Sequence, residues 1–192
     1  MILGSELYEK LHGLSFLQRI AFSASCSERL FSNYIAFVNE ANWGEPHVLR
    51  KALDTVWENL ETGTISPRDL SGLIEECDEV IPDTEDFETP MVSYALDAGT
   101  AVVGTLQLWE SGDLMRAVEI AGFARDTVYM ALSVQGLDDT EMERHPWMIR
   151  ELAKQEADIR ILANSQSHSI EVVLRLRYGW KSQNNGLSNI DL

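Results

Sequence analysis

Apolar residues recur every three or four positions along almost the whole chain, and strictly alternating runs of β-branched residues are missing. This spacing places apolar side chains on one face of a helix, so it predicts an all-α protein. We expect residues 1–192 to form a single domain, a bundle of six to seven mostly antiparallel helices with an irregular tail over 179–192. The expected helices cover 4–12, 15–39, 46–60, a segment from Ser66 and Pro67 to about 80, 90–110, 114–135 and 147–178.

Proline, glycine and aspartate mark several of the expected helix ends. Pro46 stands at a first helical position, Gly63 follows a helix, and Asp113 is the expected N-cap of the helix that follows Gly112. Such short links favour antiparallel neighbours. Segment 90–110 is apolar on most sides, which predicts that it is the central helix.

The net charge of the chain bears on the kind of partner that it can bind. The 192 residues carry 15 Lys and Arg against 31 Asp and Glu, a formal net charge of −16, while the 45% hydrophobic content is that of a globular protein. Residues 61–99 hold eleven acidic residues and one basic residue. Nucleic-acid binding depends mainly on Lys and Arg at the phosphates, so no nucleic-acid partner is expected.

Short sequence features allow predictions of the cellular compartment and of bound cofactors. The beginning of the chain shows no basic, apolar and small-residue sequence of a signal peptide, and the stretch Ala98 to Trp109 is too short to cross a bilayer. Cys26 and Cys77 lie far apart and outside any Cys-x-x-Cys motif, so we expect two buried thiols. The predictions are a cytoplasmic location, no membrane association, no metal and no cofactor.

Two charged residues stand where the helical pattern calls for apolar ones, and a third interrupts the most apolar segment. Glu28 lies in line with the apolar positions of segment 15–39, and Arg125 lies within the stripe of segment 114–135. Asp97 lies in a narrow polar strip of segment 90–110. A buried charge needs a partner, so we predict that Arg125 is buried or half-buried and bonded to Glu28 or Asp97. The pair would be either a structural bridge or the wall of a polar cavity that holds a small ligand.

Two further patterns are acidic. Glu75-Glu76-x-x-Glu79 and Glu110-x-x-Asp113 resemble the magnesium-binding motifs of all-α nucleotide pyrophosphohydrolases, but capping explains Asp113 better than metal binding does. The acidic cluster from Glu75 to Glu88 would also suit a mimic of nucleic acid, or a solvated surface.

Six segments, in order along the chain, together resemble the YjaG-like bacterial family (domain of unknown function 416). They are Cys26-Ser27-Glu28-Arg29 with Asn33-Tyr34-x-x-Phe37, Leu53-Asp54-x-x-Trp57-Glu58-x-Leu60, Ile81-Pro82-x-x-x-Asp86-Phe87, Ala95-x-Asp97-Ala98, Ala117-Val118-Glu119 and Ser188-Asn189-Ile190. The resemblance implies a small, all-helical, cytosolic bacterial protein, and it brings no activity, substrate or cofactor with it.

The resemblance also extends the set of candidate residues. The candidate polar cluster becomes Glu28, Arg29, Asn33, Tyr34, Asp97 and Arg125, and a second, surface site is formed by Asp54, Trp57, Glu58, Asp86 and Phe87. Two functions are consistent with these residues. One is a noncatalytic module that binds an unknown protein partner or a second copy of itself, as a homodimer. The alternative is a small-ligand binder or enzyme that uses Glu28, Asp97 and Arg125.

Overall fold

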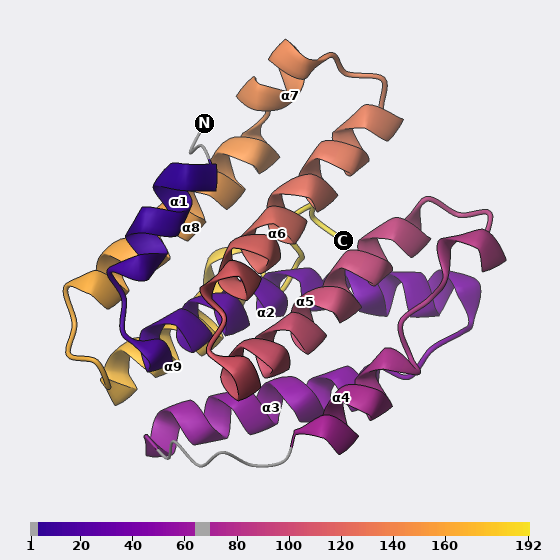
Figure 1. The fold of residues 1–192 in the computed structure, drawn as a ribbon. Coiled ribbons are helices and arrows are strands. Elements are labelled where there is room, and N and C mark those ends of the chain that lie inside the picture. Colours follow the sequence, from indigo (N-terminus) through magenta and orange to yellow (C-terminus); the bar gives the residue numbers. More distant parts are fainter. Residues whose placement is uncertain (1–3, 64–69) are drawn as a thin grey trace.

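A computed structural model describes residues 4–63 and 70–192, and the regular elements within these ranges are all helical (Figure 1). The all-α prediction is therefore confirmed. The elements are α1 (Gly4–His12), α2 (Phe16–Ala41), α3 (Pro46–Thr62), α4 (Ser71–Asp78), the 3-10 helix η1 (Thr84–Asp86), α5 (Met91–Ser111), α6 (Leu114–Val134), α7 (Asp139–Arg144), α8 (Pro146–Ala163) and α9 (Ile170–Gln183). The described ranges thus hold nine α-helices, where the sequence predicted six to seven.

Local side-chain chemistry sets several of these boundaries. Ser15 and Gln18 form a capping box that begins α2, each side chain bonding the other residue's main-chain amide. Gly112 ends α5 in the left-handed conformation, at φ 71°, which costs a glycine little. Asp113 accepts the amide of Met115 at 3.0 Å and caps α6, as the sequence predicts. This two-residue link makes α5 and α6 an antiparallel pair (Figure 1).

Helix α2 is the centre of the bundle, because it packs against α3, α5, α6, α8 and α9. The sequence predicted that position for α5, which is also buried on most sides and packs chiefly on α2 and α6. Hydropathy underestimates the burial of α2 because many of its buried residues are polar. These are Gln18, Ser23, Ser25, Ser27, Glu28, Arg29 and Asn33.

The prediction of one long helix over 147–178 is wrong, because α8 ends at Ala163 and α9 begins at Ile170. Side chains satisfy the last carbonyl groups of α8 in place of a further helical turn. Asn164 donates to the carbonyl of Arg160 at 2.8 Å, and Gln18 of α2 donates to that of Leu162 at 2.6 Å. Ser169 then caps α9. The two helices run in different directions, so each can pack on α2.

Two other boundaries differ from the predictions. Helix α7 lies between the predicted helices 114–135 and 147–178, where no helix was predicted; it is too short for a periodic pattern, although its capping box of Asp138 and Glu141 is present in the sequence. The tail expected over 179–192 is helical to Gln183, and the residues Ser188 to Ile190 are buried. The helix start predicted at Ser66 and Pro67 lies outside the described residues.

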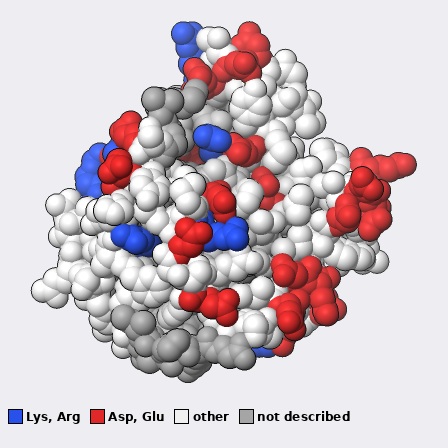
Figure 2. All heavy atoms as spheres, in the orientation of Figure 1, with Lys and Arg blue, Asp and Glu red and all other residues white. Residues whose placement is uncertain are grey.

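Acidic side chains gather over two parts of the visible surface. Figure 2 shows them over α4 and η1 on the right of the view, and over α7 at its top. Among the helices that the structure describes, none combines the length and the apolar character that crossing a bilayer requires.

Candidate functional site

Glu28 is buried, as the periodicity of its helix predicts, with a side chain that is 4% exposed. Its hydrogen-bond partners are on α3, and Nζ of Lys181 on α9 lies 4.0 Å from Oε2. Arg50 donates from Nη2 to Oε1 at 2.7 Å and from Nη1 to Oε2 at 3.0 Å, and the indole Nε1 of Trp57 donates to Oε1 at 2.8 Å. Such bidentate pairing with a third donor compensates a buried carboxylate for its lost water. Glu28 therefore joins α2 to α3.

The prediction that Arg125 is bonded to Glu28 or Asp97 is wrong. Its side chain is 43% exposed and donates to the adjacent Asp126, from Nη2 at 2.6 Å and from Nε at 2.8 Å. The buried face of α6 includes Ala117, Ala124 and Ala131, which hydropathy weights little. Leu114, Val128 and Leu132 are buried as well, so the buried face continues from the apolar stripe onto these alanines, and Arg125 lies at its exposed edge.

Asp97 also has a partner of its own. It is half-buried on α5 and accepts a hydrogen bond from the Thr127 hydroxyl at 2.7 Å. Burial raises the pKa of this carboxyl to about 6, against the opposite effect of the Thr127 hydrogen bond. Glu28, Asp97 and Arg125 thus have separate partners and do not form one cluster.

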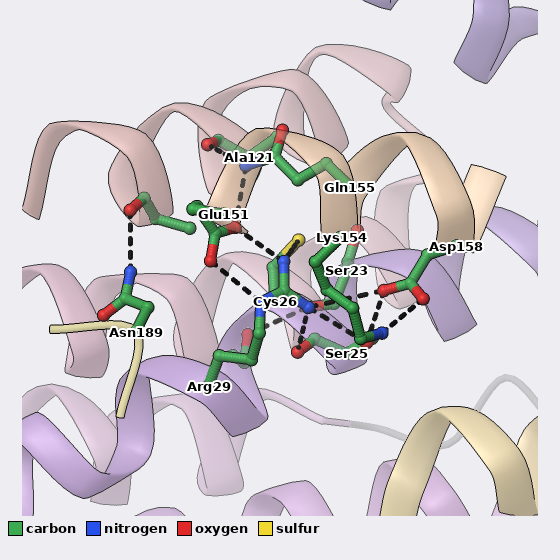
Figure 3. A network of polar contacts seen from close by, with 12 residues as sticks. Ser23, Ser25, Cys26, Arg29, Ala121, Glu151, Lys154, Gln155, Asp158 and Asn189 are labelled. Carbon is green, nitrogen blue, oxygen red and sulfur yellow. Dashed lines mark hydrogen bonds and ion pairs between the residues drawn. The ribbon is translucent and has the colours of Figure 1, made fainter. Parts of the chain in front are cut away.

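Arg29 and Glu151 carry the most deeply buried charges, since both side chains are 0% exposed (Figure 3). The Arg29 guanidinium donates to both carboxylate oxygens of Glu151 on α8, at 2.7 and 3.0 Å. The Nη1 atom donates to the carbonyl of Ser25 at 2.9 Å and lies 3.4 Å from Oδ2 of Asp158, while Nη2 lies 3.4 Å from Sγ of Cys26. Each guanidinium nitrogen therefore has an acceptor inside the protein.

The charges around Arg29 balance. Burial acts to lower the pKa of Arg29, but Glu151 and the other acidic groups around it, Asp158 among them, together outweigh burial and the pKa is raised. Burial acts to raise the pKa of Glu151, and the Arg29 charge lowers it overall. Lys154, bonded to Asp158, has its pKa lowered by burial and by Arg29. With all four groups ionised, two positive charges face two negative charges, which is the arrangement that a buried ionic cluster requires.

The Gln155 amide extends this network to α6, and the Asn189 amide separately ties the tail to the same helix (Figure 3). Gln155 donates to Oε1 of Glu151 at 2.9 Å and to the carbonyl of Ala121 at 3.0 Å. On the other side, Asn189 of the tail donates to the carbonyl of Ala124 at 2.8 Å. These bonds connect α2, α6, α8 and the tail through the centre of the protein.

Asn33 and Tyr34, which the family resemblance singled out, are fully buried and hold connecting segments in place. The Asn33 amide donates to Oδ1 of Asn189 at 3.1 Å. The Tyr34 hydroxyl donates to the carbonyl of Val80 at 2.6 Å and accepts the amide of Glu45 at 3.2 Å. Their contacts are those of structural residues.

The residues predicted as a surface site do not form one surface. Trp57 is 0% exposed, while Glu58 and Asp86 are exposed. Asp54 accepts a hydrogen bond from Arg177 of α9 at 2.7 Å. Phe87 instead packs edge-on against Phe37 of α2, with ring centroids 5.0 Å apart. The two halves of the predicted site therefore have different partners, on different helices.

Sequence reasoning missed the polar residues of α8, namely Glu151, Lys154, Gln155 and Asp158. A signal for them exists. Glu151, Gln155 and Asp158 lie within the seam that also contains the buried Met148, Ile159 and Leu162, the same kind of interruption that identified Glu28. The sequence prediction placed the residues of α8 and α9 on one helix over 147–178. The apolar positions of α8 were therefore not considered by themselves, and its seam was not recognised.

A groove opens on the surface between α6 and α8, with α7 at one end. Its volume is about 490 Å³, and its lining residues are Arg125, Asp126, Tyr129, Asp139, Glu143, Met148 and Leu152. We call it the α6/α8 groove. Tyr129 is 43% exposed, and its hydroxyl donates to Asp139 at 2.6 Å, which fixes the ring between α6 and α7. Met148 and Leu152 supply apolar surface, whereas the charged residues lie on α6 and α7.

Within the described ranges, neither the cysteines nor the metal-ligating side chains are arranged for catalysis of the common kinds. Burial raises the pKa of both the Cys26 and the Cys77 thiols to about 12, so neither is a ready nucleophile at neutral pH. Across residues 4–63 and 70–192, His, Cys, Asp and Glu side chains do not come together in groups of three or more that could hold a metal ion.

Comparison with known proteins gives a family for the whole chain. The sequence profile of a family described as "protein of unknown function (DUF416)" matches residues 6–192. "Uncharacterized protein YjaG" of Escherichia coli (strain K12) is 29% identical over 195 residues, which cover 100% of this chain and 98% of that protein. An uncharacterized protein of Haemophilus influenzae is 27% identical and covers 97% of this chain and 96% of its own.

A solved structure supports the fold. The crystal structure of a DUF416 family protein from Shewanella baltica OS155 superposes with a TM-score of 0.88 at 22% identity, over 96% of this chain and 97% of that one. The resemblance seen in the sequence is therefore confirmed, and this chain belongs to the DUF416 family.

Proposed function

We propose that this protein is a noncatalytic helical module that binds a protein partner through its surface. The observation that carries the proposal is the closed state of the central cluster. Arg29 and Glu151 are 0% exposed, and each guanidinium nitrogen has an acceptor. Catalytic groups need free capacity directed at a space where a substrate can lie. A cluster whose hydrogen-bonding groups all have partners instead holds the helices in place, and the outer faces of these helices form the protein surface.

The alternative, a ligand site built on Glu28, Asp97 and Arg125, receives less support. Glu28 is bonded to Arg50 and Trp57, and Arg125 is bonded to Asp126. Asp97 is half-buried, and burial raises the pKa of its carboxyl to about 6, but it already accepts a hydrogen bond from Thr127. A ligand that used all three would have to break pairs that already exist.

A thermal-shift screen of the intact protein tests the proposal. Divalent metals, nucleotides, amino acids and sugar phosphates would be added at millimolar concentration. A ligand at one hundred times its Kd adds about 2.7 kcal/mol of stability. For a protein of this size that raises Tm by roughly 5–10 °C. We expect no compound to do so. A metabolite that does, and whose effect disappears in Asp97→Asn, would overturn the proposal in favour of a ligand site at that carboxyl.

Light scattering distinguishes the two kinds of protein partner. A mass of 21.6 kDa supports a module that binds a different protein, whereas about twice that mass supports self-association. The formal net charge of −16 favours the first result, because two such chains repel each other at moderate ionic strength.

A further inference from the structure

The α6/α8 groove has the features of a docking site for a helix. It combines apolar surface from Met148 and Leu152 with an exposed aromatic ring, Tyr129, held in place by its hydrogen bond. Fixed aromatic residues beside a hollow are typical anchors of protein interfaces, and amphipathic helices bind in grooves of this kind. We propose that the α6/α8 groove binds an amphipathic helical segment of another protein whose polar side is rich in Lys and Arg. This inference rests on the proposed function of an interaction module.

The charge of the groove determines the chemistry of the partner. Its lining contains three carboxylates and one guanidinium. Arg125 is already paired with Asp126, and Asp139 accepts only from the neutral Tyr129 hydroxyl. Within the described part of the chain, no Lys or Arg forms an ion pair with Asp139 or with Glu143. Two carboxylates at the groove are therefore free to pair with cations of a partner.

Helix α1 is an internal example of this kind of packing. It contacts α6, and it lies along α8 in Figure 1. It buries Leu7 and Leu11, while Lys10 on its polar side donates to Glu156 of α8 at 2.8 Å. The surface of α6 and α8 thus already accepts a helix that combines buried leucines with a lysine bonded to an acidic residue. The partner helix would repeat that arrangement in the neighbouring groove.

A second copy of this chain suits the groove less well. The described surface of α7, η1 and α4 is acidic (Figure 2), and the chain as a whole carries −16. A helix from another copy would bring further negative charge toward Asp139 and Glu143. Opposite charge accelerates and orders docking, and like charge opposes it.

The test uses two synthetic helical peptides and the full-length protein. In the first peptide, leucines recur every three or four residues and the other positions are lysine. In the second, glutamate replaces every lysine. Binding is measured by fluorescence anisotropy at physiological salt, where the Debye length of about 8 Å limits long-range attraction. We expect the Leu/Lys peptide to bind and the Leu/Glu peptide not to bind.

Variants then locate the binding site. The double substitution Asp139→Lys with Glu143→Lys should weaken binding at least tenfold. The matched control is Glu75→Lys with Glu79→Lys, which changes the same charge at the same spacing at the end of α4, another acidic segment. It should weaken binding less than twofold. Leu152→Ala, which leaves every charge in place, should also weaken binding. This variant keeps the test valid if the two lysine substitutions prevent α7 from folding.

Each outcome decides a separate question. Equal losses in the two double variants would mean unspecific attraction to an acidic protein, and would overturn the inference. No binding of the Leu/Lys peptide would overturn it too. Self-association abolished by the Leu152→Ala substitution would show that a second copy occupies the groove. All three results would leave the ligand screen unaffected, so failure of this inference can be told from failure of the proposed function.

Discussion

Replacing Glu151 by glutamine removes one charge from the centre of the protein and hardly changes its shape. Arg29, 0% exposed, then loses the carboxylate that lies 2.7 Å from Nη2, and the cluster keeps two positive charges against the single negative charge of Asp158. Removing one partner of a buried ion pair costs about 3–5 kcal/mol, because the remaining charge stays buried without compensation. For a protein of this size, the loss lowers Tm by roughly 6–20 °C.

Urea unfolding followed by circular dichroism measures this loss. The matched control is Glu156→Gln on the same helix, where the partner is Lys10 at 2.8 Å and both side chains are about one-third exposed. That substitution should cost less than about 1 kcal/mol. The double variant Arg29→Met with Glu151→Leu should recover most of the stability, because it leaves no unpaired charge between these two positions. Equal losses in Glu151→Gln and Glu156→Gln would refute the role given to the buried pair.

Three further predictions concern single groups. Burial raises the pKa of Asp97 from 3.8 to about 6, so the folded protein holds this proton more tightly than the unfolded chain and loses stability as pH rises from about 4 to about 6. Asp97→Asn, which cannot ionise, should match the wild type near pH 4 in urea unfolding and exceed it above pH 6 by up to about 3 kcal/mol; a pH-independent difference would contradict this. The thiols of Cys26 and Cys77, with pKa values raised to about 12 by burial, should not react with dithionitrobenzoate in native buffer, and two per chain should react in denaturant. Tyr34→Phe removes the donor to the carbonyl of Val80 and should cost about 1–3 kcal/mol in thermal unfolding, so an unchanged Tm would count against that bond.

Most of the helical architecture could be predicted from the sequence, because helix formation leaves local marks. The spacing of apolar residues located α2, α3, α5 and α6, and Asp113 marked the start of α6. Periodicity also placed Glu28 in the interior, since a charge on an apolar seam points inward whatever surrounds it.

The partners of the buried charges could not be predicted in the same way. Glu28 meets Arg50, 22 positions away, and Arg29 meets Glu151, 122 positions away. The direction of a side chain on its own helix does not say which other helix packs there. That depends on how the helices cross, and the buried face of α6 includes alanines that contribute little to a hydropathy pattern. The interpretation of Arg125 failed for this reason, and the α6/α8 groove that contains it could be found only in three dimensions.

Our central claim is that buried charges hold the helices together while the α6/α8 groove is the part that binds a partner. Amide chemical-shift mapping of the labelled protein, titrated with the Leu/Lys peptide, tests it most directly. We predict shift changes at the groove residues of α6, α7 and α8, such as Tyr129, Asp139 and Leu152, and none around Glu75 to Glu79 at the end of α4. Shift changes centred on α4 and η1, or on the surroundings of Asp97, would contradict the account.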